Sequence, residues 1–191
     1  VLPIAVGEAT KCISLIQKRC KKYSFTVKWG EKTNTDDSEG KVLEKSNVRP
    51  TKNQILDILN SFTGKIFQKP PAFSAIKIDG KRSYKLARNN IIINHQPREV
   101  EINKLILKNI VNSDFAEFEV LCGKGTYVRS LAVDIAEKLN TKGHVTTLRR
   151  QTVGNFSKKD TIFIDFFKEI IHSPAILKKI LPIEAVLDDI P

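Results

Sequence analysis

Residues 100–122, VEINKLILKNIVNSDFAEFEVLC, decide the fold class of this chain. Apolar and polar side chains alternate on both sides of Asn112-Ser113-Asp114, a turn-forming triplet. The stretch therefore predicts two antiparallel strands, residues 100–110 and 115–122, joined as a hairpin. A third alternating run, residues 23–29, predicts a half-buried strand whose odd-numbered side chains face the core.

Helical patterns alternate with these strands along the chain. Residues 127–139 are amphipathic, and Thr51 with Gln54 forms a capping box that opens another helix, with Gly64 at its end. Weaker patterns predict strands over residues 2–6, 73–78 and 145–153 and helices over residues 7–18, 83–89 and 160–171. Because hairpins are frequent, we expect an α+β fold: one domain over residues 1–191, with a mixed, largely antiparallel sheet flanked by helices.

The charge of the chain points to a polyanionic partner. It has 32 Lys and Arg against 21 Asp and Glu, a formal net charge of +11, with 41% hydrophobic residues. This composition is that of a globular protein and excludes disordered and collagen-like chains. A basic domain with no apolar run of membrane-spanning length and no signal pattern suggests a cytoplasmic protein that binds nucleic acid. A generically basic protein with solvated lysines would have the same charge.

Several motifs resemble known sites but lack a required feature. In Gly123-Lys124-Gly125-Thr126 the lysine precedes the second glycine, which a phosphate-binding loop does not allow. The acidic loop at residues 36–39 lacks calcium-ligand spacing and is expected to be a solvated turn. Three cysteines and three histidines show no zinc-ligand spacing, so we expect free thiols and no metal. An enzyme of small-molecule metabolism is accordingly disfavoured.

Five segments in order resemble one family, the bacterial tRNA pseudouridine synthases of the TruB type. The segments are VLPIAVGEATK (1–11), YSFTVKWG with the loop DDSEG (23–30 and 36–40), PAFSAIK (71–77), KGTYVRSL (124–131) and GHVTTLRR (143–150). The resemblance implies a pseudouridine synthase fold and a cofactor-free isomerisation of the T-loop uridine (position 55) of tRNA. An aspartate begins cleavage of the glycosidic bond, and whether it attacks the sugar or the base is left open.

The resemblance also implies roles for individual residues. Tyr23 matches the tyrosine that stacks on the target base and is a candidate for removing its C5 proton, although a tyrosine opening a strand is ordinarily core packing. Arg129 matches the arginine that pairs with the catalytic aspartate. Tyr127 and Leu148 match residues that line the uridine pocket, although a leucine in a strand is usually core. Phosphate contacts would come from the basic residues Lys11, Lys77, Arg149 and Arg150.

One departure from the family pattern bears on activity. The motif with the nucleophilic aspartate belongs directly before Val1 and is not in this sequence, so we expect the 191 residues alone to be inactive. We also expect no C-terminal RNA-binding (PUA) domain within the chain, and a monomer. The alternative is a non-catalytic RNA-binding or chaperone domain of the same fold. Relatives that work with guide RNA also remain open, although the short chain without basic tails favours the stand-alone bacterial type.

Overall fold

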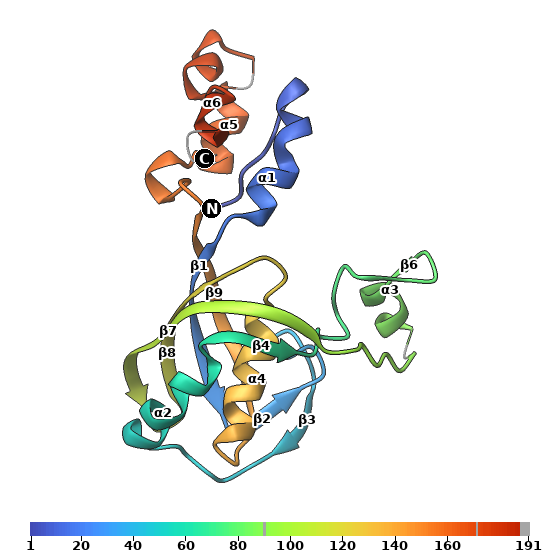
Figure 1. Cartoon of the computed structure of the whole chain (residues 1–191), viewed down its shortest axis with the longest axis vertical. Coiled ribbons are helices and arrows are strands. Elements are labelled where there is room, and N and C mark those ends of the chain that lie inside the picture. Colours follow the sequence, from blue (N-terminus) through green and yellow to red (C-terminus); the bar gives the residue numbers. More distant parts are fainter. Residues whose placement is uncertain (90, 171, 188–191) are drawn as a thin grey trace.

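The computed structural model describes residues 1–89, 91–170 and 172–187. Its centre is a five-stranded sheet in which each neighbouring pair of strands is antiparallel (Figure 1). In spatial order the strands are β4 (Gly64–Gln68), β7 (Arg98–Asn112), β8 (Phe115–Cys122), β1 (Lys21–Trp29) and β9 (Gly143–Val153). The predicted α+β fold is confirmed, and the predicted hairpin is the β7–β8 pair.

The core lies between the sheet and two helices, α2 (Lys52–Leu59) and α4 (Val128–Lys138). The odd-numbered side chains of β1 point into it as the alternation predicts, since residues two apart share a face. Phe118 of β8 is the centre of an aromatic cluster: its ring stacks on Phe25 at 5.3 Å and meets Trp29 edge-on at 6.1 Å. From α4, Leu131 and Ile135 are fully buried against this cluster.

Gly143, the first residue of β9, sets the distance between α4 and the sheet. A Cβ atom at this position would lie 2.9 Å from Ala136 Cβ and 3.2 Å from Val27 Cγ1. Because a close-packed interior has no room for such an atom, any other residue would push the helix away from β1. The glycine therefore lets α4 lie directly on the strands that carry the candidate site.

The capping box that opens α2 is confirmed. The Gln54 amide donates to Thr51 Oγ1 (3.4 Å), and the Thr51 amide donates to Gln54 Oε1 (2.8 Å). The helix ends at Leu59 and is followed by a 3-10 turn, η2 (Asn60–Phe62). Gly64 does not end the helix as predicted. With φ at 92°, it turns the chain into β4.

Four strands are not predicted by the sequence patterns. Two are β4 and β6 (Lys81–Arg82), and the others are β2 (Glu31–Thr33) and β3 (Val42–Lys45), which pair as a separate two-stranded sheet. All four residues of β3 are exposed, so this strand has no buried face to produce an alternating pattern. Short strands like these depend on their partners in space rather than on their own sequence.

A basic arm, residues 71–89 and 91–97, projects from the sheet on the right of Figure 1. It contains β5 (Lys77–Ile78), β6 (Lys81–Arg82) and α3 (Ser83–Arg88), and the turn at Asp79-Gly80 joins the two strands. The predicted strand over residues 73–78 is wrong except at its last two residues. The carbonyls of Ser74 and Ile76 accept hydrogen bonds from the backbone amides of Tyr84 and Ser83, in the first turn of α3, instead of from a strand partner.

The N-terminal elements and the described elements after β9, up to residue 187, lie together above the sheet in Figure 1. The predicted strand at residues 2–6 is wrong: this segment belongs to none of the described sheets, and Leu2, Ile4 and Val6 are exposed. The predicted helix at 160–171 begins only at Ile164, and its last residue lies outside the described residues. The elements here are η1 (Gly7–Cys12), α1 (Ile13–Lys18), η3 (Lys158–Asp160), α5 (Ile164–Ile170), η4 (Pro174–Lys179) and α6 (Glu184–Leu187). None of the helices described is long and apolar enough to span a membrane.

Candidate functional site

The pairing of β1 with β9 separates the candidate residues of these strands between the two faces of the sheet. Tyr23 lies opposite Arg150 and Phe25 opposite Leu148, so these four residues share the face that carries the core. Ser24 lies opposite Arg149, which places Arg149 on the other face. The register shifts next to Tyr23, between Lys22 and Tyr23, an irregularity of the kind that commonly re-aims side chains beside active sites.

Tyr23 is half-buried and packs against the edge of the core cluster. Burial raises the pKa of its phenol, while a hydrogen bond and the positive charge from Arg150 act in the opposite direction. The phenol therefore combines an apolar ring on the core with a polar tip beside a cation. The placement of Tyr23 is compatible with both roles that the sequence allows, packing against the core and contact with a base.

Leu148 is not the core residue that its strand position suggests. Its side chain is 48% exposed, whereas its cross-strand neighbour Phe25 is 2% exposed. β9 is the last strand of the sheet, and α4 covers its beginning at Gly143 but not this later part. An exposed leucine next to a half-buried tyrosine is an apolar surface that a planar base can contact.

The first turn of α4 is fastened to the chain segment that leads into the basic arm. The Tyr127 amide donates to the side-chain oxygen of Gln68, the last residue of β4 (2.7 Å), and Ser130 Oγ donates to the Lys69 carbonyl (2.8 Å). Gln68 is 1% exposed, so this contact lies in the interior. These bonds fix the helix end that carries Tyr127 and Arg129.

Arg129 reaches from this helix end into a cluster of oxygen atoms. One of its terminal nitrogens donates to the Thr35 carbonyl (2.8 Å) and to Asp37 Oδ2 (3.1 Å), and the other donates to the Phe73 carbonyl (2.7 Å). The side chains of Arg129 and Asp37 are 22% and 25% exposed. A positive charge at a helix N-terminus is unfavourable by itself, so these acceptors stabilise it there.

Asp37 is the functional candidate that the sequence interpretation missed. Its Oδ1 accepts from the Thr35 hydroxyl (2.5 Å) and the Glu39 amide (3.2 Å), in addition to the Arg129 contact at Oδ2. The loop is not a free turn, because Asp36 O and the Ser38 amide both bond to the backbone of Val145 in β9. The spacing of Thr35 and Asp37 is a local signal for such a turn, but nothing in the sequence pairs it with Arg129.

Two further carboxyl groups, Asp36 and Asp134, lie close together beside Asp37. Burial, and then the nearby Glu137 and Asp36, raise the pKa of Asp134 to about 7. Burial also raises the pKa of Asp36 to about 6, against the positive charges of Lys32 and Arg129. In the folded protein both carboxyl groups therefore keep their protons to a higher pH than an ordinary aspartate does.

Replacing Asp134 by asparagine is expected to stabilise the protein at pH 8. The folded pKa is raised above the ordinary value, so folding takes up a proton at intermediate pH, and stability falls as pH rises from about 4 to about 7. Above that range the buried charge of Asp134 destabilises the parent fully. Asp134→Asn removes this charge, which should raise the free energy of unfolding at pH 8 by on the order of 2 kcal/mol after allowance for solvent. Urea unfolding at pH 5 and pH 8 measures this. A stability difference that is the same at both pH values would contradict it.

The other predicted phosphate contacts do not meet at this site. Lys11 lies on η1, where it pairs with Glu8 (2.5 Å), and Lys77 lies in the basic arm. Arg149 is on the opposite face of the sheet from Tyr23. Of the residues predicted for substrate contact, the structure places Tyr23, Leu148 and Arg150 on one sheet face and Tyr127 at the end of the helix that covers it. Arg129 follows in that helix.

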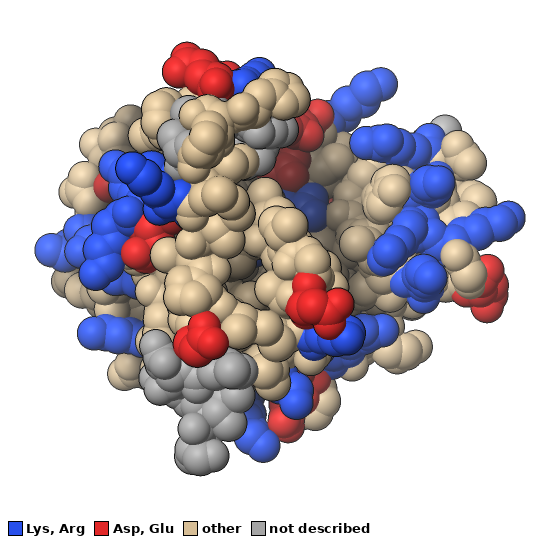
Figure 2. Space-filling view, turned by 90° about the horizontal axis from the view of Figure 1, so that it is seen from above, with Lys and Arg blue, Asp and Glu red and all other residues tan. Residues whose placement is uncertain are grey.

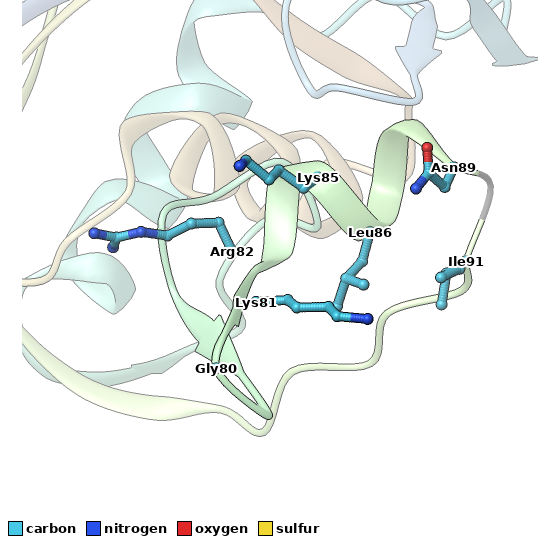
Figure 3. A pocket seen from close by; sticks show the side chains of 7 residues that line it. All are labelled: Gly80, Lys81, Arg82, Lys85, Leu86, Asn89 and Ile91. Atoms are coloured by element: carbon cyan, nitrogen blue, oxygen red, sulfur yellow. The ribbon is translucent and has the colours of Figure 1, made fainter.

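The basic arm carries five Lys and Arg residues and one Asp. Figure 2 shows these cations gathered on the right-hand side of the molecule, away from the sheet. A pocket of about 460 Å³ lies here between α3 and the segment that follows it, and its lining includes Lys81, Leu86 and Ile91; in Figure 3 the Lys81 side chain extends beneath Leu86, whereas Arg82 and Lys85 point away from it. Among the described residues, no three His, Cys, Asp or Glu side chains are grouped as metal ligands.

Comparison with known proteins confirms the family resemblance. Residues 1–128 match the TruB family pseudouridylate synthase (N terminal domain), and residues 129–188 match the tRNA pseudouridylate synthase B C-terminal domain. The whole chain is 47% identical to tRNA pseudouridine synthase B of Bradyrhizobium diazoefficiens, covering 56% of that protein. It is 45% identical to the protein of the same name from Rhodospirillum rubrum, covering 62%. The chain therefore spans only part of the curated relatives that it matches.

Solved structures agree at the level of the fold. A chain in the crystal structure of a Cbf5-Nop10-Gar1 complex superimposes with a TM-score of 0.70 over 98% of this chain and 49% of its own length, at 23% identity. A chain from an H/ACA RNP bound to a substrate RNA containing 2'-deoxyuridine gives a TM-score of 0.66 at 19% identity, over 96% of this chain and 46% of its own. With both halves of its sequence matched and its sheet shared with these structures, the chain belongs to the TruB family of pseudouridylate synthases.

Proposed function

We propose that the protein containing this chain isomerises the T-loop uridine of tRNA to pseudouridine without a cofactor. The observation that carries the proposal is the placement of Arg129. Its guanidinium is held by Asp37 and two carbonyls at the end of α4, the helix that packs on the sheet face from which Tyr23 and Leu148 project. A cation held rigidly at this face fits a reaction in which a carboxylate attacks a nucleoside.

The target base is proposed to bind between Tyr23, Tyr127 and Leu148. A base must leave the stack of the T loop to react, which costs a few kcal/mol and requires a pocket with stacking surfaces. Tyr23 is half-buried and Leu148 is exposed on the same face, so both can contact a base without moving the core. Tyr23 would then accept the proton that leaves C5 after the new carbon–carbon bond has formed.

The nucleophile is proposed to be an aspartate in the segment that precedes Val1, as the family resemblance implies. Asp37 is a poor candidate, because both of its oxygens are already engaged by donors. A carboxylate that accepts several hydrogen bonds has little electron density left for attack. Asp37 is better suited to hold Arg129, which would in turn orient the incoming carboxylate and keep it ionised.

The basic arm is proposed to bind the phosphate backbone of the T arm. Its cations are exposed and lie together on one side of the molecule. The Arg129 contact to the Phe73 carbonyl joins the base of this arm to the candidate site. Contacts of this kind supply affinity without sequence information.

Neutralising two cations of the arm is expected to weaken RNA binding in a salt-dependent way. For Lys81→Gln/Lys85→Gln, the slope of log Kd against log salt for a T-arm stem-loop should fall by about 1 to 2, since each lost phosphate contact removes roughly one. Fluorescence anisotropy at several salt concentrations measures the slope. The matched control is Lys178→Gln/Lys179→Gln in η4, which changes the net charge equally. Equal slopes for the two variants would mean that the RNA does not bind to the basic arm.

The activity itself is tested by tritium release from a T-arm stem-loop containing [5-³H]uridine. We expect the 191 residues alone to bind this RNA without releasing tritium, and the protein extended through the preceding segment to release it. Binding without release by the extended protein would favour the alternative, a non-catalytic RNA-binding domain of the same fold. Release by the 191 residues alone would show that the upstream aspartate is not needed.

We further propose that the protein acts as a monomer in the cytoplasm, where its tRNA substrate is found. The monomer rests on the size of the substrate contact, since one chain carries the arm, the base pocket and Arg129 together. Sedimentation of the protein with and without a T-arm stem-loop tests the stoichiometry of one chain for each RNA.

A further inference from the structure

Arg150 is held from two directions at the end of β9. Its backbone carbonyl accepts a hydrogen bond from the Val1 nitrogen (2.7 Å), and its side-chain Nε donates to the Val1 carbonyl (2.7 Å). The side chain is therefore fixed rather than free to follow a ligand. Across the strand pair it lies directly opposite Tyr23, on the same sheet face.

We propose that Arg150 is a positioning residue for Tyr23, holding the phenol in place and stabilising the phenolate that accepts the C5 proton. This inference rests on the proposed function. It replaces the interpretation of Arg150 as a phosphate contact with a role inside the site. The adjacent Arg149 has no such role, because the strand alternation places it on the opposite face beside Ser24.

Tyr23 acts as a base in two steps. It first loses its phenolic proton to water, and the guanidinium of Arg150 offsets the negative charge that forms on the oxygen. The phenolate then takes the proton from C5: the electrons of the C5–H bond form the C5–C6 double bond, and those of the C6–N1 double bond move to N1. N1 takes up a proton from water, which matches the one that Tyr23 gave to water.

The groups around Tyr23 support a role for Arg150 in stabilising the phenolate. Burial of the ring and the Cys122 thiol of β8 disfavour the phenolate, and Arg150 is the neighbour that favours it. Without Arg150 the half-buried phenol would lose the positive charge that lowers its pKa, which makes a poor base. The bond from Nε to the Val1 carbonyl holds the guanidinium, and the bond from the Val1 nitrogen holds the Arg150 backbone.

The experiment compares Arg150→Gln with Arg149→Gln, adjacent residues of equal charge on opposite faces. In Arg150→Gln the phenol of Tyr23, followed by its ultraviolet absorbance, should titrate at higher pH than in the parent. Tyr23→Phe identifies which step of the titration belongs to this residue. The single-turnover rate constant for tritium release should fall by about tenfold or more, while the Kd for RNA stays within about threefold. Arg149→Gln should leave the titration of Tyr23 unchanged, and Lys178→Gln in η4 should leave the rate constant unchanged.

Arg150→Lys is the control for a folding defect. It keeps a cation at this position, so it should partly restore the titration of Tyr23 and the rate constant for tritium release. A normal titration of Tyr23 in Arg150→Gln, together with weaker RNA binding and an unchanged rate constant, would overturn the proposal and restore the phosphate contact. The rate constants are measured in the protein extended through the segment that precedes Val1, and if that extended parent releases no tritium, the proposed function fails. In that case the titration still decides whether Arg150 acts on Tyr23.

Discussion

Arg129→Lys is expected to lower the single-turnover rate constant for pseudouridine formation by at least about 100-fold while the protein remains folded. Arginine holds three acceptors at once: the Thr35 carbonyl, the Asp37 carboxylate and the Phe73 carbonyl. A lysine ammonium is a compact point charge and cannot span these positions. The charge would remain, but its orientation toward the catalytic carboxylate would be lost.

Tritium release in single-turnover experiments measures this effect, and anisotropy gives the affinity for RNA separately. Arg149→Lys is the control, because Arg149 is exposed on the opposite sheet face. An unchanged rate constant with weaker RNA binding would mean that Arg129 serves only as a phosphate contact. The Asp37→Asn variant should follow Arg129→Lys in direction, since it removes the charge that holds the guanidinium.

Phe118→Ala is expected to destabilise the protein by about 3–5 kcal/mol. Phe118 is 1% exposed and joins two other aromatic rings, Phe25 and Trp29, at the centre of the sheet. Removing its ring would leave a cavity that the strands cannot close, because β8 is paired on both sides. An effect of this size is a large part of the total stability of a domain.

Urea unfolding followed by the fluorescence of Trp29, the single tryptophan, measures this loss. The matched control is Phe67→Ala in β4, whose side chain is 75% exposed and should change stability by no more than about 0.5 kcal/mol. Similar losses for the two variants would mean that the aromatic cluster is not the centre of the core.

The sequence predicts the main strands and helices of this fold because they carry strong periodic patterns. β1, β8 and α4 each bury one face and expose another, so their spacing alone indicates their type and their inward residues. β3 has no buried residue, and most of the predicted strand at 73–78 bonds to the first turn of α3 instead of to a partner strand. In both places the outcome depends on contacts with distant segments, which local patterns do not contain.

The sequence motifs were sufficient to indicate the family, and family membership is confirmed over nearly the whole chain. They could not show how the candidate residues are arranged. An apolar residue in a strand, such as Leu148, is expected in the core. Leu148 is exposed because β9 is the last strand of the sheet and α4 does not extend over this residue. Exposure of this kind is a property of the assembled layers and not of the strand.

Taken by itself, the sequence determined the α+β class and the inward face of β1, and its resemblance to the family indicated Tyr23, Tyr127 and Arg129 as candidates. Only the tertiary structure paired Arg129 with Asp37, because the two residues come from a helix end and a loop far apart in the chain. It also separated Arg149 from Arg150, since adjacent residues of a strand point to opposite faces and the register with β1 decides which of them meets Tyr23.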